Sequence, residues 1–417
     1  MRVIYFYSEI QTPRSQWIVG EILSKFGCYL FFLDDKKKFK TANGVKINYS
    51  NNSVCEKEIH IVPQGLLFEK NIVPQTNLEE QIRLNLFEKK PIDIFSAAFY
   101  LLSRYEEYLA FEPDAHGRFT AKHSLAHRLG FLQRPLIDEW RLALQKQIEL
   151  LYPDAKFLDI PFEIRPTYDI DQAFSYKNKG FFRTFFALLK DIKNKNRWQV
   201  LFQKAQDPFD TFAELDAFHQ SKKLHPTYFI LLGDWATFDK NISHQNADFQ
   251  EIIKKIASQY NTGIHPSYRS NSSSLILKKE KKRLEKIIEK EVVFSRQHFL
   301  KLHLPSTYQQ LMNEGIKQDS SMGYADDIGF RASTAYAFFW YDLTKEEVST
   351  LVINPFQVMD VTLKEYLKLT PSEAYIAIQN IKNNMQNTGG QLVTLWHNSS
   401  FDEDWKGWKE MYYAIFS

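Results

Sequence analysis

The 417-residue chain contains little cysteine, glycine or proline. Its only cysteines, Cys28 and Cys55, do not form a C-x-x-C pair, so we expect neither a disulfide framework nor a cysteine-based zinc site. With 15 glycines and 15 prolines, the chain is neither collagen-like nor of low complexity. No uninterrupted apolar run reaches about 18 residues, so we expect no transmembrane segment. Ser8 and Glu9 interrupt the first apolar stretch, so we expect no signal peptide and a cytoplasmic location.

The chain also lacks an excess of charge of one sign. It has 53 Lys and Arg residues against 50 Asp and Glu residues, a formal net charge of +3. This small excess does not favour nucleic acid as a partner. The apolar share of 44% and the charged share of 25% are ordinary for globular proteins and exclude wholesale disorder. The aromatic share of 15% is high, which fits a large core or an aromatic-lined groove.

The hydrophobic pattern predicts two units along the chain. Residues 1–155 read as a smaller N-terminal α/β domain of unknown role, with strands at 3–7, 29–33 and 58–62 and helices at 15–26, 94–109 and 136–151. In residues 156–417, strands at 163–168, 226–232, 262–265, 292–296, 351–353 and 391–396 alternate with helices at 181–192, 209–222, 249–260, 275–289, 308–314 and 372–386. This alternation predicts βαβ units and a distorted or incomplete (β/α) barrel.

Polar residues follow several of the predicted barrel strands. Asp169 and Asp171 come at the end of the first strand, and His265, His298 and His397 follow later strands. Because the carboxyl ends of parallel strands meet at one rim, we expect these side chains to converge. Carboxylate and imidazole groups suit a divalent transition metal, with zinc preferred and cobalt, nickel or iron as alternatives. Each residue alone also fits a structural role, as a turn, a helix cap or an ion-pair partner.

The order of these residues resembles that of the polysaccharide deacetylase family, the NodB-homology carbohydrate esterases, over about residues 160–417. The matching segments are Thr-Tyr-Asp-Ile-Asp at 167–171, His-Pro-Ser-Tyr-Arg at 265–269, Arg-Gln-His at 296–298, Asp319 with Gly323 and Tyr324, and Leu-Trp-His at 395–397. The sequence of residues 319–331 is also similar to that of a subgroup of bacterial deacetylase-like proteins common in Bacteroidetes. Members of that subgroup carry an N-terminal domain of unknown role.

The resemblance implies roles for individual residues. Asp171 and His265 would be metal ligands, and Arg269 replaces the family's second histidine. We expect His298 to take the place of that lost ligand. The resemblance further implies catalytic roles for three residues, with Asp169 as general base, Arg296 as its orienting partner and His397 as general acid. Candidate substrate-binding residues, mostly aromatic, are Tyr168, Trp235, Tyr268, Arg269, Asp319, Tyr324 and Trp396.

The expected function is therefore metal-dependent removal of an acetyl group, N-linked or O-linked, from a carbohydrate or glycoconjugate. Two alternatives stay open. The replacement at Arg269 fits a non-catalytic glycan-binding relative, and the same scaffold also suits a metal-dependent hydrolase of a non-sugar amide.

Overall fold

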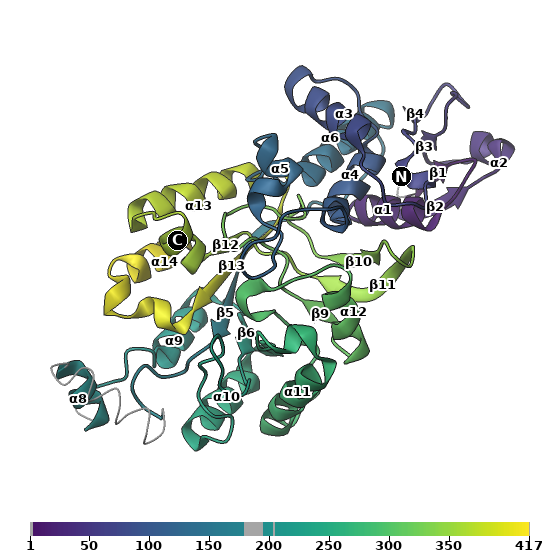
Figure 1. The fold of residues 1–417 in the computed structure, drawn as a ribbon. Coiled ribbons are helices and arrows are strands. Elements are labelled where there is room, and N and C mark those ends of the chain that lie inside the picture. The colour runs from purple at the N-terminus through teal and green to yellow at the C-terminus, as the bar shows by residue number, and fades with distance from the viewer. Residues whose placement is uncertain (1–2, 179–194, 203–204, 417) are drawn as a thin grey trace.

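The structure is a computed structural model, and it describes residues 3–178, 195–202 and 205–416. The chain forms two sheets, each covered by helices, and the smaller unit lies against one end of the larger one (Figure 1). The helix expected at 181–192 lies outside the described residues. Among the helices described, none has both the length and the apolar composition required to cross a membrane.

The N-terminal unit is built on a four-stranded parallel sheet of order β2-β1-β3-β4. Its strands are β1 Val3–Tyr7, β2 Tyr29–Leu33, β3 Val45–Tyr49 and β4 Ile59–Ile61. Its helices are α1 Pro13–Ser24, α2 Lys36–Thr41, α3 Thr76–Glu88, α4 Ile94–Leu102, α5 Leu125–Arg128 and α6 Leu136–Leu151. Helix α1 begins at a capping box formed by Thr12 and Ser15, with Pro13 in its first turn, which explains why the chain turns helical there.

The second unit is built on a nine-stranded sheet of order β10-β11-β9-β8-β7-β6-β5-β13-β12. Its strands are β5 Phe162–Ile170, β6 Thr227–Ile230, β7 Asn261–Ile264, β8 Phe294–Ser295, β9 Gln318–Asp319, β10 Phe338–Asp342, β11 Glu347–Ile353, β12 Val358–Met359 and β13 Gly390–His397. Its helices are α8 Lys195–Leu201, α9 Phe212–Lys222, α10 Ala247–Gln259, α11 Ser274–Ile288, α12 Ser306–Asn313, α13 Pro371–Met385 and α14 Trp408–Ile415. All neighbouring strands are parallel except the β10–β11 pair.

This arrangement confirms the predicted fold class, a distorted (β/α) barrel with a smaller α/β unit. The distortion lies where β11 leads into β12. There the backbone N–H of Asn354 donates to the carbonyl of Asp319 (2.8 Å), and that of Gln357 donates to the carbonyl of Val393 (3.1 Å). The connecting segment therefore spans the gap between β9 and β13 that a regular strand fills in a closed barrel.

The strand register brings polar residues together at one rim. In the β5–β13 pair, Asp169 lies directly beside His397, and in the β5–β6 pair it lies beside Phe229. His265 comes directly after β7, and Arg296 comes directly after β8. The parallel order thus places the ends of β5, β7, β8 and β13 along the same edge.

The two units share one continuous apolar core. Trp17 of α1 packs on Tyr341 of β10 with ring centroids 5.0 Å apart, and its indole N–H donates to the carbonyl of Phe339 (3.0 Å). A buried ion network also joins the two units. Glu107 of the N-terminal unit accepts two hydrogen bonds from Arg331 of the barrel unit (2.9 and 2.6 Å). The interface is therefore both apolar and ion-paired, which favours a fixed arrangement of the two units.

Candidate metal centre

Three sequence-predicted residues converge at the barrel rim. The ligating atoms of Asp171, His265 and His298 all lie within 4.8 Å of one another. The Nε2 atom of His265 is 3.3 Å from one Asp171 oxygen, and the Nε2 atom of His298 is 3.5 Å from the other. Both imidazoles are buried, whereas the Asp171 side chain is 33% exposed, so the cluster opens on the aspartate side.

Hydrogen bonds on the far side of each ring fix which nitrogen faces the cluster. The Nδ1 atom of His265 lies 2.6 Å from the carbonyl oxygen of Arg296, and the Nδ1 atom of His298 lies 2.9 Å from a carboxylate oxygen of Asp239. Because these oxygens can only accept, each Nδ1 donates its proton to them, and Nε2 is the ring nitrogen that faces Asp171. This arrangement is typical of metal-ligating histidines.

One acceptor in the cluster lacks a partner. Among the described residues, Oδ1 of Asp171 is buried and makes no hydrogen bond. A buried acceptor without a donor is unfavourable, and a cation placed among the three side chains would satisfy it. Two neutral imidazoles and a carboxylate are also the donor set that zinc and similar ions prefer. The residues present therefore fit a divalent transition metal.

The electrostatics of the cluster agree with this fit. Burial alone would lower the pKa of His298, but Asp171 and Asp239 outweigh it and raise the pKa to about 9. Burial alone would raise the pKa of Asp171, yet His298 and His265 hold that pKa well below its ordinary value. Without another cation, the carboxylates thus draw protons onto the imidazole. A metal ion would replace that proton.

Asp169 and Arg296 form a buried pair beside the cluster. Nη1 of Arg296 donates to Oδ1 of Asp169 (2.9 Å), and the other oxygen of Asp169 lies 3.6 Å from Nε2 of His265. The guanidinium is further held by the carbonyl of Ser320 (2.9 Å) and by the ring of Phe229, 4.4 Å from its central carbon. One oxygen of Asp169 is thus tied to the arginine, while the other faces the cluster.

His397 is oriented by a residue that the sequence did not indicate. Its Nδ1 lies 2.9 Å from Oδ1 of Asp360, and its backbone N–H donates to Oδ2 of the same residue (2.7 Å). Its Nε2 lies 3.7 Å from Asp171. Burial alone would lower the pKa of His397, but Asp360, followed by Asp171 and Asp169, raises the pKa to about 10.

The cluster opens into a cavity of about 160 Å³. Besides the residues above, the cavity is lined by the apolar side chains of Leu300, Ala325, Met359 and Val361 and by the polar side chains of Arg118 and Tyr366. Arg118 belongs to the N-terminal unit, so both units contribute to this cavity. Arg118, Asp239 and Asp360 are the residues at the site that sequence reasoning missed. Asp360 directly follows the apolar pair of β12, which is the one signal that could have pointed to it.

The structure corrects several of the expected substrate contacts. Tyr168 and Trp396 are fully buried and point away from the cavity toward the helices. The hydroxyl of Tyr168 bonds with His219 of α9 (2.8 Å) and Tyr412 of α14 (2.5 Å), and Trp396 packs on Tyr412. The reason is the strand alternation, because each residue directly precedes one that faces the barrel interior.

Asp319 and Tyr324 are also structural. Asp319 is fully buried and accepts hydrogen bonds from Ser295 (2.7 Å) and from the hydroxyl and backbone of Ser321 (3.0 and 2.8 Å). Tyr324 is buried at the interface of the units, where its hydroxyl accepts from Arg104 (3.0 Å). Neither lines the cavity. Both expectations of a substrate contact are therefore corrected.

The other expected substrate residues lie around the cavity or farther away. Trp235 is 64% exposed on the loop after β6, and Arg269 is exposed on the loop after β7; neither lines the cavity. Tyr268 lies next to the cavity wall, with its ring centroid 5.4 Å from that of Phe299. Tyr268 is therefore the candidate whose ring packs against a residue that lines the cavity.

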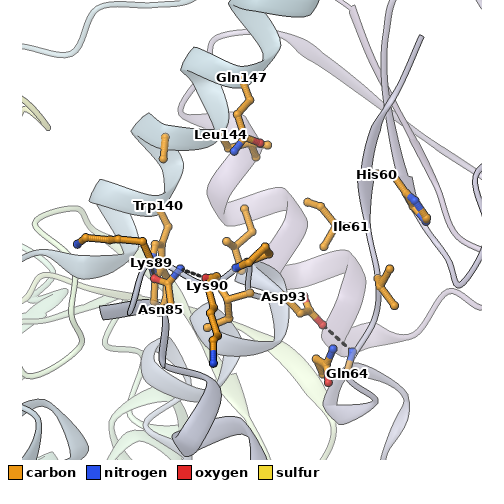
Figure 2. A pocket seen from close by; sticks show the side chains of 15 residues that line it. His60, Ile61, Gln64, Asn85, Lys89, Lys90, Asp93, Trp140, Leu144 and Gln147 are labelled. Carbon is orange, nitrogen blue, oxygen red and sulfur yellow. Dashed lines mark hydrogen bonds between the residues drawn. The ribbon is translucent and has the colours of Figure 1, made fainter. Parts of the chain in front are cut away.

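A larger cleft lies in the N-terminal unit, and its chemistry differs. It measures about 500 Å³ and lies between β4, α6 and the segment that joins α3 to α4 (Figure 2). Its one lining carboxylate, Asp93, is buried and accepts from Tyr49, from the backbone of Gln64, and from the first turn of α4. Within the described part of the chain, the barrel rim alone gathers three potential metal ligands. The smaller cavity is therefore the candidate active site.

Fold and site together define an α/β barrel protein with a centre of carboxylates and imidazoles at its strand ends. A family of unknown function, DUF7033, matches residues 4–153. No curated protein matches the chain.

Several solved structures are similar to part of the chain. One is a protein from Mycobacterium smegmatis assigned to the polysaccharide deacetylases, with 15% identity, 62% of this chain and 86% of that chain covered, and a TM-score of 0.40. Another is the polysaccharide deacetylase Bc1974 from Bacillus cereus, with 12% identity, coverage of 61% and 86%, and a TM-score of 0.31. A third is BA3943 from Bacillus anthracis, described as a CE4 family pseudoenzyme, with 8% identity, coverage of 61% and 60%, and a TM-score of 0.31.

Proposed function

We propose that this protein is a metal-dependent hydrolase that removes an acetyl group, N-linked or O-linked, from a carbohydrate. The observation that carries the proposal is the convergence of Asp171, His265 and His298, with ligating atoms within 4.8 Å, between two further carboxylate-bearing pairs. A structural cluster has no need of three lone pairs aimed at one point. A metal hydrolase requires such an arrangement.

Asp171, His265 and His298 would hold the metal. A divalent ion bound there would activate a water molecule as nucleophile and polarise the acyl carbonyl. The protonated Nδ1 atoms of both histidines, held by Arg296 and Asp239, keep the rings in the orientation that this role demands.

Asp169 is the general base of the proposal. Arg296 keeps one of its oxygens occupied and favours the ionised form, so the second oxygen is left to accept the proton of the attacking water. The guanidinium is fully buried, so its charge acts on Asp169 with little screening by solvent.

His397 is the general acid. Asp360 holds Nδ1 of the ring and stabilises the imidazolium, so Nε2 carries the proton that the leaving oxygen or nitrogen needs. The side chain is 14% exposed and lies beside the cavity, so it is accessible to a bound substrate.

A carbohydrate substrate is supported by the motif order in the sequence and by the character of the cavity. The apolar side chains of Leu300, Ala325, Met359 and Val361 suit an acyl group, and the polar groups of Arg118 and Tyr366 suit hydroxyl groups. The glycan-binding alternative depends on the replacement of a metal-binding histidine by Arg269. Because His298 supplies a third donor to the cluster, the reason for this alternative is weaker.

The test combines metal analysis with a substrate panel. Protein purified without chelators is analysed for bound metal, and acetate release is measured from N-acetylated and O-acetylated sugars and from simple amides. We expect bound metal and acetate release from at least one class of sugar, and loss of both after chelation. Metal binding without any hydrolysis would support the glycan-binding alternative, and hydrolysis of simple amides alone would support the amidase alternative.

A further inference from the structure

The N-terminal unit reaches into the candidate active site through one loop. Residues 114–118 of this loop lie against the segment that follows β8. The ring of His116 has its centroid 4.9 Å from that of Phe299, and its Nδ1 lies 3.3 Å from the hydroxyl of Tyr268. Arg118 lines the cavity itself.

Arg118 joins three separate segments at the cavity wall. Its Nε donates to Asp114 within its own loop (2.7 Å), its Nη1 to the carbonyl of Phe299 (2.8 Å), and its Nη2 to the hydroxyl of Tyr366 (3.1 Å). The side chain is only 8% exposed. A buried guanidinium with a partner on every nitrogen is held in one position, and it holds its partners in turn.

The segment that receives the Phe299 contact has an unusual backbone. Phe299 and Leu300 both have positive φ angles, +60° and +51°, in the left-handed region that side-chain-bearing residues rarely adopt. Such a conformation persists only where the surroundings enforce it. The carbonyl of Phe299 lies between the two strained residues, and it is the atom that Arg118 binds.

This strained turn directly follows His298. The backbone N–H of Leu300 donates to the carbonyl of Gln297 (2.9 Å), and that of Lys301 donates to the carbonyl of His298 (3.3 Å). A turn that relaxed to ordinary angles would alter the direction of the chain next to His298. It would also move Leu300 out of the cavity wall.

We propose that Arg118 is a positioning residue of the candidate metal centre, by which the N-terminal unit holds the turn at Phe299 and Leu300 and thereby aims His298 at Asp171. The role of the turn in holding a metal rests on the proposed function. The contact by which Arg118 holds the turn in place is independent of that function. The N-terminal unit is then a part of the active site and not a separate module.

The first test measures hydrogen–deuterium exchange of the peptide covering residues 296–303 in the full-length protein. In Arg118→Met, exchange at Leu300 and Lys301 is expected to rise by about 10-fold to 100-fold, the factor for loss of a hydrogen bond from a charged donor. Arg118→Lys keeps the positive charge but loses the planar guanidinium with its several N–H donors, so it should give a smaller rise in exchange. Arg134→Met removes a partly exposed, ion-paired arginine of the same unit and should leave this peptide unchanged. Equal exchange in Arg118→Met and Arg134→Met would overturn the proposal.

The second test uses the visible absorption of bound Co²⁺, which reports the geometry of its ligands. We expect Arg118→Met to weaken Co²⁺ binding and to change the spectrum, while Arg134→Met matches the wild type. Faster exchange with an unchanged Co²⁺ spectrum and affinity would reduce Arg118 to a structural residue and overturn its role at the centre. If the wild type bound no Co²⁺, the proposed function would fail, and the exchange result alone would decide whether Arg118 holds the turn.

Discussion

This protein has two buried clusters of charged groups, and they differ in how their charges are balanced. At the interface of the units, Glu107 accepts hydrogen bonds from both Arg104 and Arg331, so each carboxylate oxygen has a cationic donor. The polar atom left without a partner there is a donor, Nη1 of Arg104. At the barrel rim, the buried atoms without a partner among the described residues are two acceptors, Oδ1 of Asp171 and Oδ2 of Asp239, and one donor, Nη2 of Arg296.

The source of positive charge differs between the two clusters. In the interface cluster the arginines supply permanent positive charge, because their protonation does not depend on pH in the ordinary range. At the rim, four carboxylates face one arginine. Because their negative charge exceeds the positive charge of the arginine, it favours the protonated imidazole and raises the pKa of His298. An excess of buried acceptors over donors is the condition that a bound cation would balance.

The largest effect is expected from Asp169→Asn. The amide has the shape of the carboxylate but cannot accept the proton of the attacking water, so the rate of acetate release should fall by about 10²-fold to 10⁴-fold. Metal content should stay near that of the wild type, because Asp169 is not among the three proposed ligands. Near-native activity in this variant would remove Asp169 as the base.

Glu107→Gln tests the other side of the comparison. Removing the carboxylate leaves Arg331 and Arg104 buried without their counter-charge, so the free energy of unfolding should fall by about 3–5 kcal/mol. Denaturant unfolding measures this change. The control is Glu139→Gln, which breaks a partly exposed pair with Arg134 and should change the free energy of unfolding by less than about 1 kcal/mol. If folded Glu107→Gln lost its metal as well, the two clusters would not be functionally distinct.

Two carboxylates at the rim should separate binding from catalysis. Asp239→Asn weakens the partner of His298, so metal affinity is expected to fall by about 10-fold to 100-fold. Asp360→Asn weakens the partner of His397, so kcat should fall while metal affinity is unchanged. Isothermal titration with Zn²⁺ and steady-state kinetics measure these quantities. Equal loss of metal affinity in both variants would show that His397 is a ligand instead of the acid.

The last effect, which appears only as a dependence of stability on pH, concerns Asp138 at the interface of the units. Its carboxylate accepts from Thr334 (2.9 Å) and from the backbone of Ala335 (2.7 Å), and burial raises its pKa from 3.8 to about 7. Because the folded pKa is above the unfolded one, the folded state binds the proton more tightly. Its contribution to stability is present below about pH 4 and is lost as the pH rises to about 7.

Denaturant unfolding of the wild type and of Asp138→Asn across this pH range tests the effect. The difference between the two isolates Asp138 from the other titrating groups. We expect stability to fall more steeply with rising pH in the wild type than in the variant. Parallel curves would show that Asp138 keeps an ordinary pKa in the folded protein.

Sequence reasoning identified much of the barrel rim because strand ends are predictable. Asp171, His265 and His298 each follow a recognisable apolar stretch, and parallel strands place such ends together. The same logic, applied more strictly, would have removed Tyr168 and Trp396 from the substrate residues. Side chains alternate along a strand, so a residue beside the inward-facing Asp169 or His397 must face the helices.

The remaining site residues left no comparable signal. Asp239 lies in a loop, and Asp360 follows β12, which has two residues and is too short for a periodic pattern. Arg118 belongs to a different unit of the chain, so its place in the cavity depends on how two units pack. Strands β9 and β12 were not predicted because each has only two residues. Helix α6, in contrast, was predicted with the same bounds that the structure has.

The central claim is that the rim cluster of Asp171, His265 and His298 is a cation site. The most direct measurement is calorimetric titration of chelator-treated protein with Zn²⁺, for the wild type and for His298→Ala in parallel. We expect equimolar binding by the wild type and a loss of affinity of at least about 10-fold in His298→Ala. Equal affinity in both proteins, or no saturable binding by a folded wild type, would contradict it.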